Sequence, residues 1–499
     1  MKKSKRIIAF LFAAQMLLMT ACSESAVNTG ETDAAAGETA AVVETAAAET
    51  EAELTELQKR AAISDNLPEK SYDGKAFRVM TTDSKDYQFR VEELTGESTN
   101  DAVYNRNLRI EDRFDVSIET VIDAAPYSSI DAIVLAGVNS VELVDHFEYK
   151  AYVPISHGNY LDWNKIPMID QNQPWWNKVS NDASTINGKL YCIVGDLSIT
   201  GMRYTYAMFY NMDLLEDYGY TADTMYGYVK EGVWTIDKLT EVASNIHEDA
   251  NGDGKDNAGD TFGFAYWRYY GNDVWVTAIG EKVTSMENGE LVISLGTEKV
   301  YNTLQKLITL VYETPGAHKY EDENVGRAEF TSGNIAIQPL LFDDCYARLR
   351  DVAFSYGILP FPKYDEEQTG YYTISMDQHS VFGTPKTLPE DNYEFVGIMM
   401  EVLNAETYKT VYPEFYDAAL KGKYSEDAVT AEMIDLIMDG RVFEFSFQFG
   451  EYLSNLPYTF RYCLYNNDPN LASSLKRVEK PIKKQLEKLY SFYADEAAE

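Results

Sequence analysis

Segments patterned as β-strands alternate with segments patterned as helices from Lys75 onward. Residues 75–82 alternate apolar and polar side chains, as a half-buried strand does. Residues 99–113 are expected to form a helix capped by Thr99-Asn100-Asp101, and residues 115–122 to form a second strand. The strand pattern recurs at residues 132–135 and 141–144, and this order is typical of an α/β lobe with a mostly parallel sheet. Further strand-like segments follow at residues 190–194 and 206–210.

The charge of the chain limits its partners. Its 499 residues include 43 Lys and Arg against 80 Asp and Glu, for a net charge of −37. A surface this acidic is repelled by phosphate backbones, so we predict no nucleic-acid partner. The length allows two or three domains.

The N-terminus has the features of a secretory signal. Four basic residues between Lys2 and Arg6 precede an apolar run that ends at Met19, which is shorter than a membrane-spanning helix requires. The sequence Leu18-Met19-Thr20-Ala21-Cys22 resembles a bacterial lipobox, although Met19 stands where Leu is usual. We predict a signal peptide over residues 1–21 and a lipid-modified Cys22; the alternative is an ordinary secreted protein cut near Ala21.

Residues 22–69 are predicted to form a disordered linker behind that anchor. Repeats of Ala, Glu and Thr fill this segment, and no Lys or Arg occurs in it before Lys59. Such a composition buries too little apolar surface to offset the entropy of ordering the chain. Transient helix is expected around residues 49–60.

Sequence motifs of enzyme active sites are missing. The histidines form no HExxH motif, there is no G-x-S-x-G or phosphate-binding glycine loop, and no carboxylate pair stands out among so many. Cys192, Cys345 and Cys463 lie among apolar residues and are predicted to be buried free thiols. We predict no enzymatic activity, with a secreted polysaccharide-active enzyme as the alternative.

The segment from Asp249 to Asp260 resembles a calcium-binding loop. It places oxygen-bearing residues at loop positions 1, 3, 5, 7, 9 and 12 and Gly254 at position 6, where the chain must turn sharply. An EF-hand ends in Glu, whereas this loop ends in Asp; the alternative is a polar turn without a metal. The predicted ligands of a structural Ca²⁺ are Asp249, Asn251, Asp253, the Lys255 carbonyl, Asn257 and Asp260.

Aromatic residues gather in two polar segments, around residues 174–177 and 266–275. Flat rings beside hydrogen-bonding side chains suit a carbohydrate cleft, although packing in the core is the alternative for each ring.

A periodic apolar stripe from Leu471 to Tyr493 predicts an amphipathic helix with a solvated basic face. Pro481 is expected to kink or split it.

The order and spacing of several short segments resemble those of extracytoplasmic solute-binding lipoproteins of bacterial ABC importers, of the carbohydrate-binding type related to maltose-binding protein. These segments are residues 100–107, 186–191, 209–215, 233–239, 249–260, 330–336 and 356–363. The resemblance implies a two-lobe α/β fold of the type II periplasmic-binding-protein class, with hinge crossings near residues 197–203, 380–385 and 418–423 and a helical C-terminal part. It implies an N-terminal lobe of residues 70–199 with 380–418, and a C-terminal lobe of residues 200–379 with 419–499.

The function that this resemblance implies is capture of a sugar or oligosaccharide in the inter-lobe cleft and its delivery to a membrane permease. The protein is expected to be a monomer at the extracellular face of the bacterial cytoplasmic membrane, held there only by its lipid. A binding protein for peptides or other solutes is the alternative. Strand ends and aromatic loops are where such folds place ligands, so the predicted ligand contacts are Thr82, Asp83, Trp175, Trp176, Trp267, Tyr269, Tyr270 and Trp275.

Overall fold

The computed structural model describes residues 55–269, 271–287, 290–416, 420 and 428–495. All of them belong to one compact unit of the chain. Within this part of the chain, no helix is both long and apolar enough to cross a lipid bilayer.

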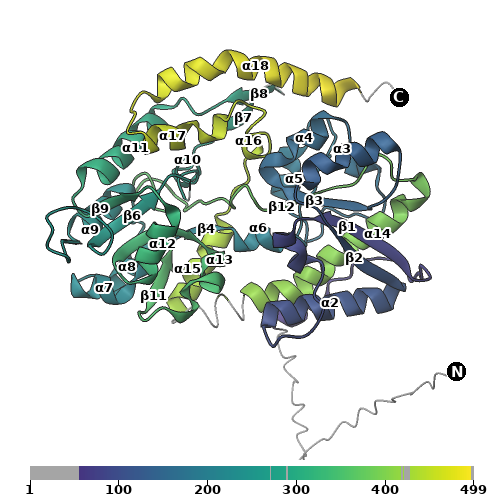
Figure 1. Cartoon of the computed structure of the whole chain (residues 1–499), viewed down its shortest axis with the longest axis horizontal. Coiled ribbons are helices and arrows are strands. Elements are labelled where there is room, and N and C mark those ends of the chain that lie inside the picture. The colour runs from purple at the N-terminus through teal and green to yellow at the C-terminus, as the bar shows by residue number, and fades with distance from the viewer. Residues whose placement is uncertain (1–54, 270, 288–289, 417–419, 421–427, 496–499) are drawn as a thin grey trace, which may run out of the picture. The chain divides into compact units, whose positions relative to one another are not determined.

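A four-stranded sheet forms the centre of the first lobe (Figure 1). Strand β1 (Lys75–Thr81) pairs in parallel with β2 (Val116–Ile122) and with β3 (Leu143–Phe147). Strand β12 (Ser380–Gly383) returns from far along the chain and pairs antiparallel to β3. Helix α2 packs on β2, α3 packs on β3, and α14 packs on α2. The helices of this lobe are α2 (Ser98–Phe114), α3 (Pro126–Ala136), α4 (Tyr152–Ser156), α5 (Lys178–Ser184) and α14 (Tyr393–Glu406).

Two of the predicted strands of this lobe are not strands. Residues 132–135 lie in helix α3, which begins with Pro126 at its first turn and ends where Gly137 adopts a left-handed conformation. A proline at the helix start and a glycine just after its end are the usual helix boundaries, and they outweigh the apolar run between them. Residues 190–194 form only an isolated bridge, from Ile193 to Phe382.

A larger mixed sheet forms the centre of the second lobe, with strand order β11-β4-β10-β6-β5 and β9 beside β6. The mostly parallel sheet predicted from residues 75–144 is that of the first lobe, where two of the three strand pairs are parallel. The sheet of the second lobe is mixed, because β4 runs antiparallel to both of its neighbours and only the β10–β6 and β6–β9 pairs are parallel. The strands are β4 (Tyr206–Asn211), β5 (His247–Glu248), β6 (Thr261–Trp267), β9 (Ala317–Tyr320), β10 (Ile335–Leu341) and β11 (Tyr356–Leu359).

Short helices surround the second sheet, and α9 has a side-chain cap at its start. The Thr235 hydroxyl accepts a hydrogen bond from the Lys238 amide, which caps the helix, and Trp234 is fully buried with its indole N–H on the Pro360 carbonyl. The helices are α7 (Met212–Asp217), α8 (Ala222–Lys230), α9 (Ile236–Ser244), α10 (Trp275–Ala278), α11 (Glu298–Ile308), α12 (Glu323–Thr331), α13 (Phe342–Ala347), α15 (Ala428–Asp439) and α17 (Thr459–Tyr465). A hairpin of β7 (Thr284–Glu287) and β8 (Glu290–Ile293) lies apart from the sheet.

The folded part of the chain begins earlier than residue 70, so the predicted linker is too long at its C-terminal end. Helix α1 (Glu56–Ala62) starts with a capping box at Thr55, and the Arg60 guanidinium lies 4.9 Å from the Tyr408 ring centroid. Asp65 forms an ion pair of 2.5 Å with Arg113 of α2. These contacts supply the stabilisation that the composition of the segment alone does not. The predicted signal peptide and Cys22 lie outside the described residues.

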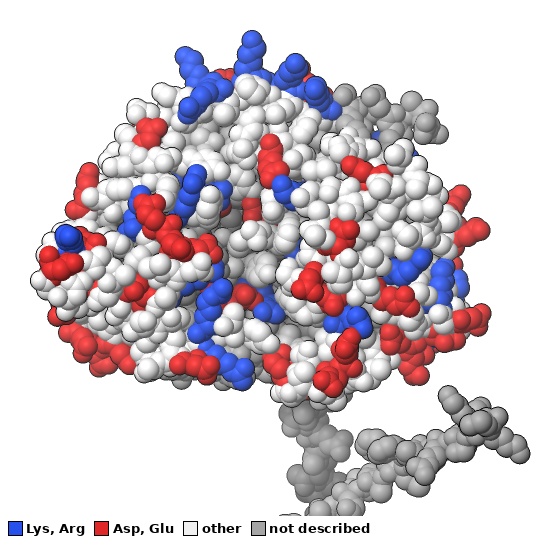
Figure 2. Space-filling model, in the orientation of Figure 1, with Lys and Arg blue, Asp and Glu red and all other residues white. Residues whose placement is uncertain are grey.

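The C-terminal stripe forms one continuous helix, α18 (Leu471–Asp495), with Pro481 inside it. The stripe side chains Ile482, Leu486 and Leu489 are buried, as predicted. Pro481 was predicted to kink or split the helix; it does not split it, and the kink stays a prediction. The exposed lysines of α18 project from the upper edge of the molecule in Figure 2.

Candidate functional site

A cavity of about 550 Å³ lies between the two lobes. Tyr149 reaches it from the first lobe, next to β3, and Tyr204 reaches it from the segment that crosses between the sheets. A second cavity of about 390 Å³ shares Tyr204 and Asp343 and adds Ser84 from the first lobe. Figure 2 shows the molecule hollowed near the middle of the face that it presents. We call the two cavities together the inter-lobe cleft.

Tyrosines and charged groups dominate the wall of the larger cavity. Six tyrosines contribute rings, and three arginines and five carboxylates contribute hydrogen-bonding groups. These residues are Tyr149, Tyr204, Tyr206, Tyr269, Tyr458 and Tyr462; Arg327, Arg348 and Arg461; and Asp273, Glu323, Asp343, Asp377 and Glu451.

The arginines of the cleft are held in place by carboxylates and rings. Arg461 forms an ion pair of 2.5 Å with Asp273, and its guanidinium lies 4.2 Å from the Tyr458 ring centroid. Arg203 forms an ion pair of 2.5 Å with Asp343 and lies 4.7 Å from the Tyr87 ring centroid. Because planar guanidinium groups donate in fixed directions, a wall built in this way presents a preformed pattern of donors and acceptors.

Burial changes the protonation of two acids in this wall. It raises the pKa of Asp273 to about 7, although Arg461 acts in the opposite direction. It also raises the pKa of Asp377, whose carboxylate accepts a hydrogen bond from the Tyr458 hydroxyl. Near neutral pH Asp273 is therefore present in both its charged and its neutral form, so its carboxyl group can accept or donate hydrogen bonds next to aromatic faces. That combination suits a ligand with many hydroxyl groups.

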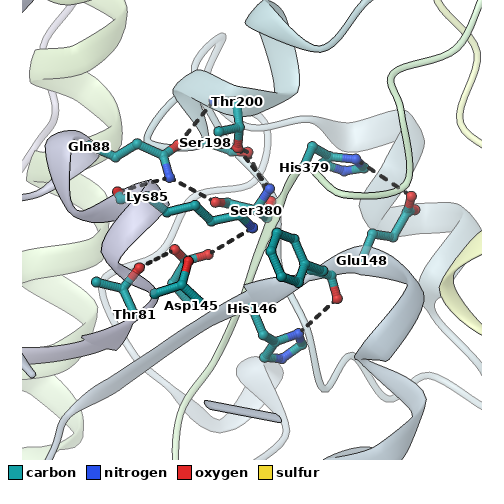
Figure 3. Close-up of polar contacts among 12 residues, drawn as sticks. Thr81, Lys85, Gln88, Asp145, His146, Glu148, Ser198, Thr200, His379 and Ser380 are labelled. Carbon is teal, nitrogen blue, oxygen red and sulfur yellow. Dashed lines mark hydrogen bonds and ion pairs between the residues drawn. The ribbon is translucent and has the colours of Figure 1, made fainter. Parts of the chain in front are cut away.

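A buried polar network joins the first lobe to the two segments that cross between the sheets (Figure 3). The crossing segments are α6 (Ile199–Arg203) and β12. Gln88 donates to the Ser380 hydroxyl at 2.8 Å and accepts from the Thr200 amide at 3.0 Å. The Ser380 amide donates to the Thr200 hydroxyl at 2.8 Å, which ties the two crossings to each other.

Lys85 and Asp145 form a buried ion pair beside this network. Their charged atoms lie 3.7 Å apart, and neither side chain exposes more than 1% of its surface. The Thr81 hydroxyl donates to Asp145 at 2.7 Å. Burial lowers the pKa of Lys85 to about 8 and raises the pKa of Asp145. A buried charge is costly without its partner, so loss of either member of the pair should destabilise the folded protein.

Among the predicted ligand contacts, Tyr269 lines the cleft, and 48% of its surface is exposed. Tyr270 lies outside the described residues. Thr82 and Asp83 do not line either cavity, but the next residue along the chain, Ser84, lines the smaller one.

The four tryptophans predicted to contact ligand are core residues, and the structure corrects that prediction. Trp175 and Trp176 are buried in the first lobe, and Trp267 and Trp275 are buried in the second. A ring with almost no exposed surface cannot stack on a ligand. The indole N–H groups of Trp175 and Trp176 both donate to the buried Glu401, at 3.0 and 2.9 Å.

Glu401 gives this packing a pH dependence. Burial raises its pKa to about 7, while the indole and backbone hydrogen bonds act in the opposite direction. As the pH rises from about 4.5 to 7, the unfolded chain releases this proton while the folded protein retains it, so stability falls. We expect the free energy of unfolding, measured in urea, to fall between pH 5 and pH 7.5, and to fall less in Glu401→Gln. Glu390→Gln, at an exposed position of the same lobe, should keep the wild-type slope. Equal slopes in Glu401→Gln and the wild type would contradict this assignment.

Most residues of the cleft wall are not among the ligand contacts predicted from the sequence. Arg203, Tyr204, Tyr458 and Arg461 were not among the predicted residues, yet each lines a cavity. The available signal was the alternation of Tyr with Arg at residues 203–206 and 458–462. Both stretches also fit the pattern of an amphipathic helix or strand, so the pattern alone does not show which side chains face a ligand.

The predicted calcium loop connects β5 to β6 and wraps around its own carboxylates. Asp249 accepts hydrogen bonds from the amides of Gly252, Asp253 and Gly254, at 2.7 to 3.2 Å. Gly254 has a φ of 75°, a conformation that glycine adopts without strain. The side-chain Nδ2 of Asn257 lies 3.0 and 3.2 Å from the two Asp253 carboxylate oxygens and 3.1 Å from the Lys255 carbonyl oxygen.

Three oxygens of the loop thus converge on one donor, which is the kind of oxygen set a hard cation takes. Asp260 is fully buried and holds the loop ends together by accepting from the Ala250 and Asn257 amides. Within the described ranges, no three His, Cys, Asp or Glu side chains already stand close enough to hold an ion. Ion binding would require the Asn257 side chain to rotate, so that its Oδ1 replaces Nδ2 on the side that faces Asp253 and the Lys255 carbonyl.

Comparisons with known proteins agree with this architecture. Residues 166–381 match the family model described as bacterial extracellular solute-binding protein. No curated protein matches the chain.

Three solved structures with the same fold share little sequence with this chain. One is a cyclo/maltodextrin-binding protein in complex with maltotetraose, with 14% identity, a TM-score of 0.56, and coverage of 82% of this chain and 97% of that one. Another is the GacH receptor of Streptomyces glaucescens, solved without ligand and with acarbose, with 13% identity, a TM-score of 0.52, and coverage of 83% and 99%. A third is UgpB from Mycobacterium tuberculosis in complex with glycerophosphocholine, with 12% identity, a TM-score of 0.53, and coverage of 83% and 98%.

The predicted two-lobe fold is therefore confirmed. Residues 166–381 therefore match the family of bacterial extracellular solute-binding proteins, and the chain has the two-lobe fold of the solved structures compared above.

Proposed function

We propose that the protein captures a sugar or oligosaccharide in the inter-lobe cleft and delivers it, chemically unchanged, to the permease of an ABC transporter. The observation that carries this proposal is the wall of the larger cavity, in which six tyrosine rings alternate with arginines and carboxyl groups. Rings stack on the apolar faces of sugars, and the charged groups bind the hydroxyls around the ring edge. The maltotetraose complex, which has the same fold, supports a carbohydrate ligand.

The proposed mechanism requires two lobes that close on the ligand. A ligand that contacts both walls binds the closed arrangement better than the open one, and this difference in affinity shifts the population toward closure. The permease would then recognise the closed form. This role needs no catalytic group, and we infer that the carboxyl groups of the cleft bind the ligand without reacting with it.

A panel of neutral mono- and oligosaccharides, peptides and glycerophosphodiesters tests the ligand class. The protein is incubated with each compound, and its melting temperature is compared with that of the ligand-free protein. Saturable stabilisation by oligosaccharides, confirmed by calorimetric titration, supports the proposal. Stabilisation only by peptides or by phosphodiesters would replace it with another ligand class.

We also propose that the protein acts as a monomer tethered outside the cell by a lipid on Cys22. The resemblance of the sequence from Leu18 to Cys22 to a lipobox supports the lipid anchor. Mass spectrometry of the protein from bacterial membranes gives the test. A diacylglycerol on an N-terminal Cys22 is expected, and an unmodified N-terminus near Ala21 would contradict it.

The loop between β5 and β6 is proposed to bind a structural Ca²⁺. Asp249, Asn251, Asp253, the Lys255 carbonyl, Asn257 and Asp260 would hold the ion, which would bring no chemistry beyond holding the loop closed. The support for this proposal is the convergence of three loop oxygens on one donor at 3.0 to 3.2 Å.

Removing calcium is expected to lower the melting temperature by several degrees. An ion present at about 100 times its dissociation constant stabilises the folded state by about 2.7 kcal/mol, which corresponds to several °C in a protein of this size. Melting is measured in excess Ca²⁺ and in excess chelator. Asp253→Asn is the matched control, because it keeps the side-chain size and should melt at the same temperature in both. A wild-type protein that melts identically in both conditions would contradict the calcium assignment.

A further inference from the structure

The C-terminal segment from Glu444 to Asp495, called the C-terminal strap here, contacts both lobes. Its base lies on the second lobe. The Glu444 carboxylate accepts from the Val283 amide at 2.6 Å, and the Leu291 amide of β8 donates to the Tyr490 hydroxyl of α18 at 2.6 Å. The predicted assignment of residues 419–499 to the C-terminal lobe describes only this part of the strap.

The strap reaches the first lobe at Glu451. This carboxylate forms an ion pair of 2.6 Å with Lys150 and accepts a hydrogen bond of 3.0 Å from the Tyr152 hydroxyl. Lys150 and Tyr152 directly follow β3, so the contact joins the strap to the sheet of the first lobe. Glu451 also lines the inter-lobe cleft.

A second contact lies at the end of the strap. The Tyr493 ring of α18 lies 5.1 Å from the Tyr191 ring, and only 1% of Tyr493 is exposed. Tyr191 belongs to the segment in which Ile193 bridges β12 of the first sheet. Figure 1 shows α18 running along one edge of the molecule from the second lobe toward α4 of the first. A fully buried aromatic side chain is a strong anchor, because burying it contributes about 2–3 kcal/mol.

We propose that the C-terminal strap sets the separation of the two lobes and hence the width of the cleft. Rotation of the lobes about α6 and β12 would have to withdraw Tyr493 from its site and separate Glu451 from Lys150. The strap also supplies Asn455, Tyr458, Arg461 and Tyr462 to the cleft wall, so its position and the shape of the cleft change together. The consequence for ligand affinity rests on the proposed function, whereas the effect on lobe separation does not.

The lobe separation can be measured between two spin labels by pulsed electron spin resonance in the ligand-free protein. Leu135 on α3 and Val325 on α12 are exposed positions, one on each lobe, and each is replaced by cysteine for labelling. The native cysteines Cys192, Cys345 and Cys463 are buried, and labelling of the protein without added cysteines checks that they do not react.

Tyr493→Ala and Glu451→Gln are each expected to give a longer-distance population that the wild type lacks. Glu451→Gln keeps the side-chain size, so the distance can still be measured in this variant if Tyr493→Ala does not fold. Lys484→Gln is the matched control, since it changes an exposed position of the same helix and should give the wild-type distribution. Wild-type distributions in both Tyr493→Ala and Glu451→Gln would overturn the proposal, and so would an equal change in Lys484→Gln. Because no ligand is added, failure of the carbohydrate proposal leaves this result unaffected.

Discussion

Trp267→Ala is expected to lower the free energy of unfolding by about 3–5 kcal/mol, the usual cost of emptying a large aromatic site in a core. Trp267 ends β6 and is 1% exposed, and the Trp267 ring fills the space that a side chain at Gly326 would otherwise occupy. Tyr269, two positions further along, is 48% exposed. Tyr269→Ala is therefore expected to change stability by no more than about 0.5 kcal/mol.

Urea unfolding of the two variants measures this contrast, and a calorimetric titration with a stabilising oligosaccharide measures binding. Tyr269→Ala should fold like the wild type and bind more weakly, because it removes a ring from the cleft wall. The assignment of Trp267 to the core fails if Trp267→Ala retains wild-type stability. The assignment of Tyr269 to the cleft fails if Tyr269→Ala binds with wild-type affinity.

Breaking the buried Lys85–Asp145 pair is expected to have an effect of similar size. Lys85→Met leaves a buried carboxylate without its cation, which typically costs about 3–5 kcal/mol. The loss should be smaller at pH 5 than at pH 8, because the unpaired Asp145 escapes part of the penalty by taking up a proton, and its pKa is already raised by burial.

The double variant Lys85→Met/Asp145→Asn separates the charge effect from packing. Removing both charges should recover most of the stability that Lys85→Met loses, since replacing a buried pair by neutral groups is often nearly neutral. Urea unfolding of the wild type, both single variants and the double variant completes the cycle. If the double variant is as unstable as the sum of the single variants, the pair does not interact, and the hinge must be held by the Gln88 network alone.

The sequence predicts the first lobe well, because local signals there agree with the tertiary structure. The strand patterns at residues 75–82 and 115–122 correspond to β1 and β2, and the predicted helix over residues 99–113 corresponds to α2. Residues 132–135 have the apolar run of a buried strand, but Pro126 and Gly137 mark the two ends of a helix that contains them. The predicted burial of Cys192, Cys345 and Cys463 is confirmed.

The ligand contacts were harder to predict, because burial is a property of the whole fold. Trp175 and Trp176 lie in a polar stretch of sequence, yet their indoles turn inward to Glu401, which is more than 220 residues away along the chain. Arg461 and Asp273 form one wall of the cleft although 188 residues separate them. A single sequence carries no signal for such pairings. The lobe boundaries within the crossing segments stay a prediction, and most of the third crossing, around residues 418–423, lies outside the described residues.

The central claim is that the cleft holds a carbohydrate reversibly and releases it unaltered. Purified protein is titrated calorimetrically with the oligosaccharide that raises its melting temperature most, and the sugar is then recovered and weighed by mass spectrometry. We predict one bound molecule per chain, weaker binding by Tyr269→Ala, and recovery of the sugar at its original mass. Recovered fragments of lower mass, or heats that do not saturate for any oligosaccharide tried, would contradict the account.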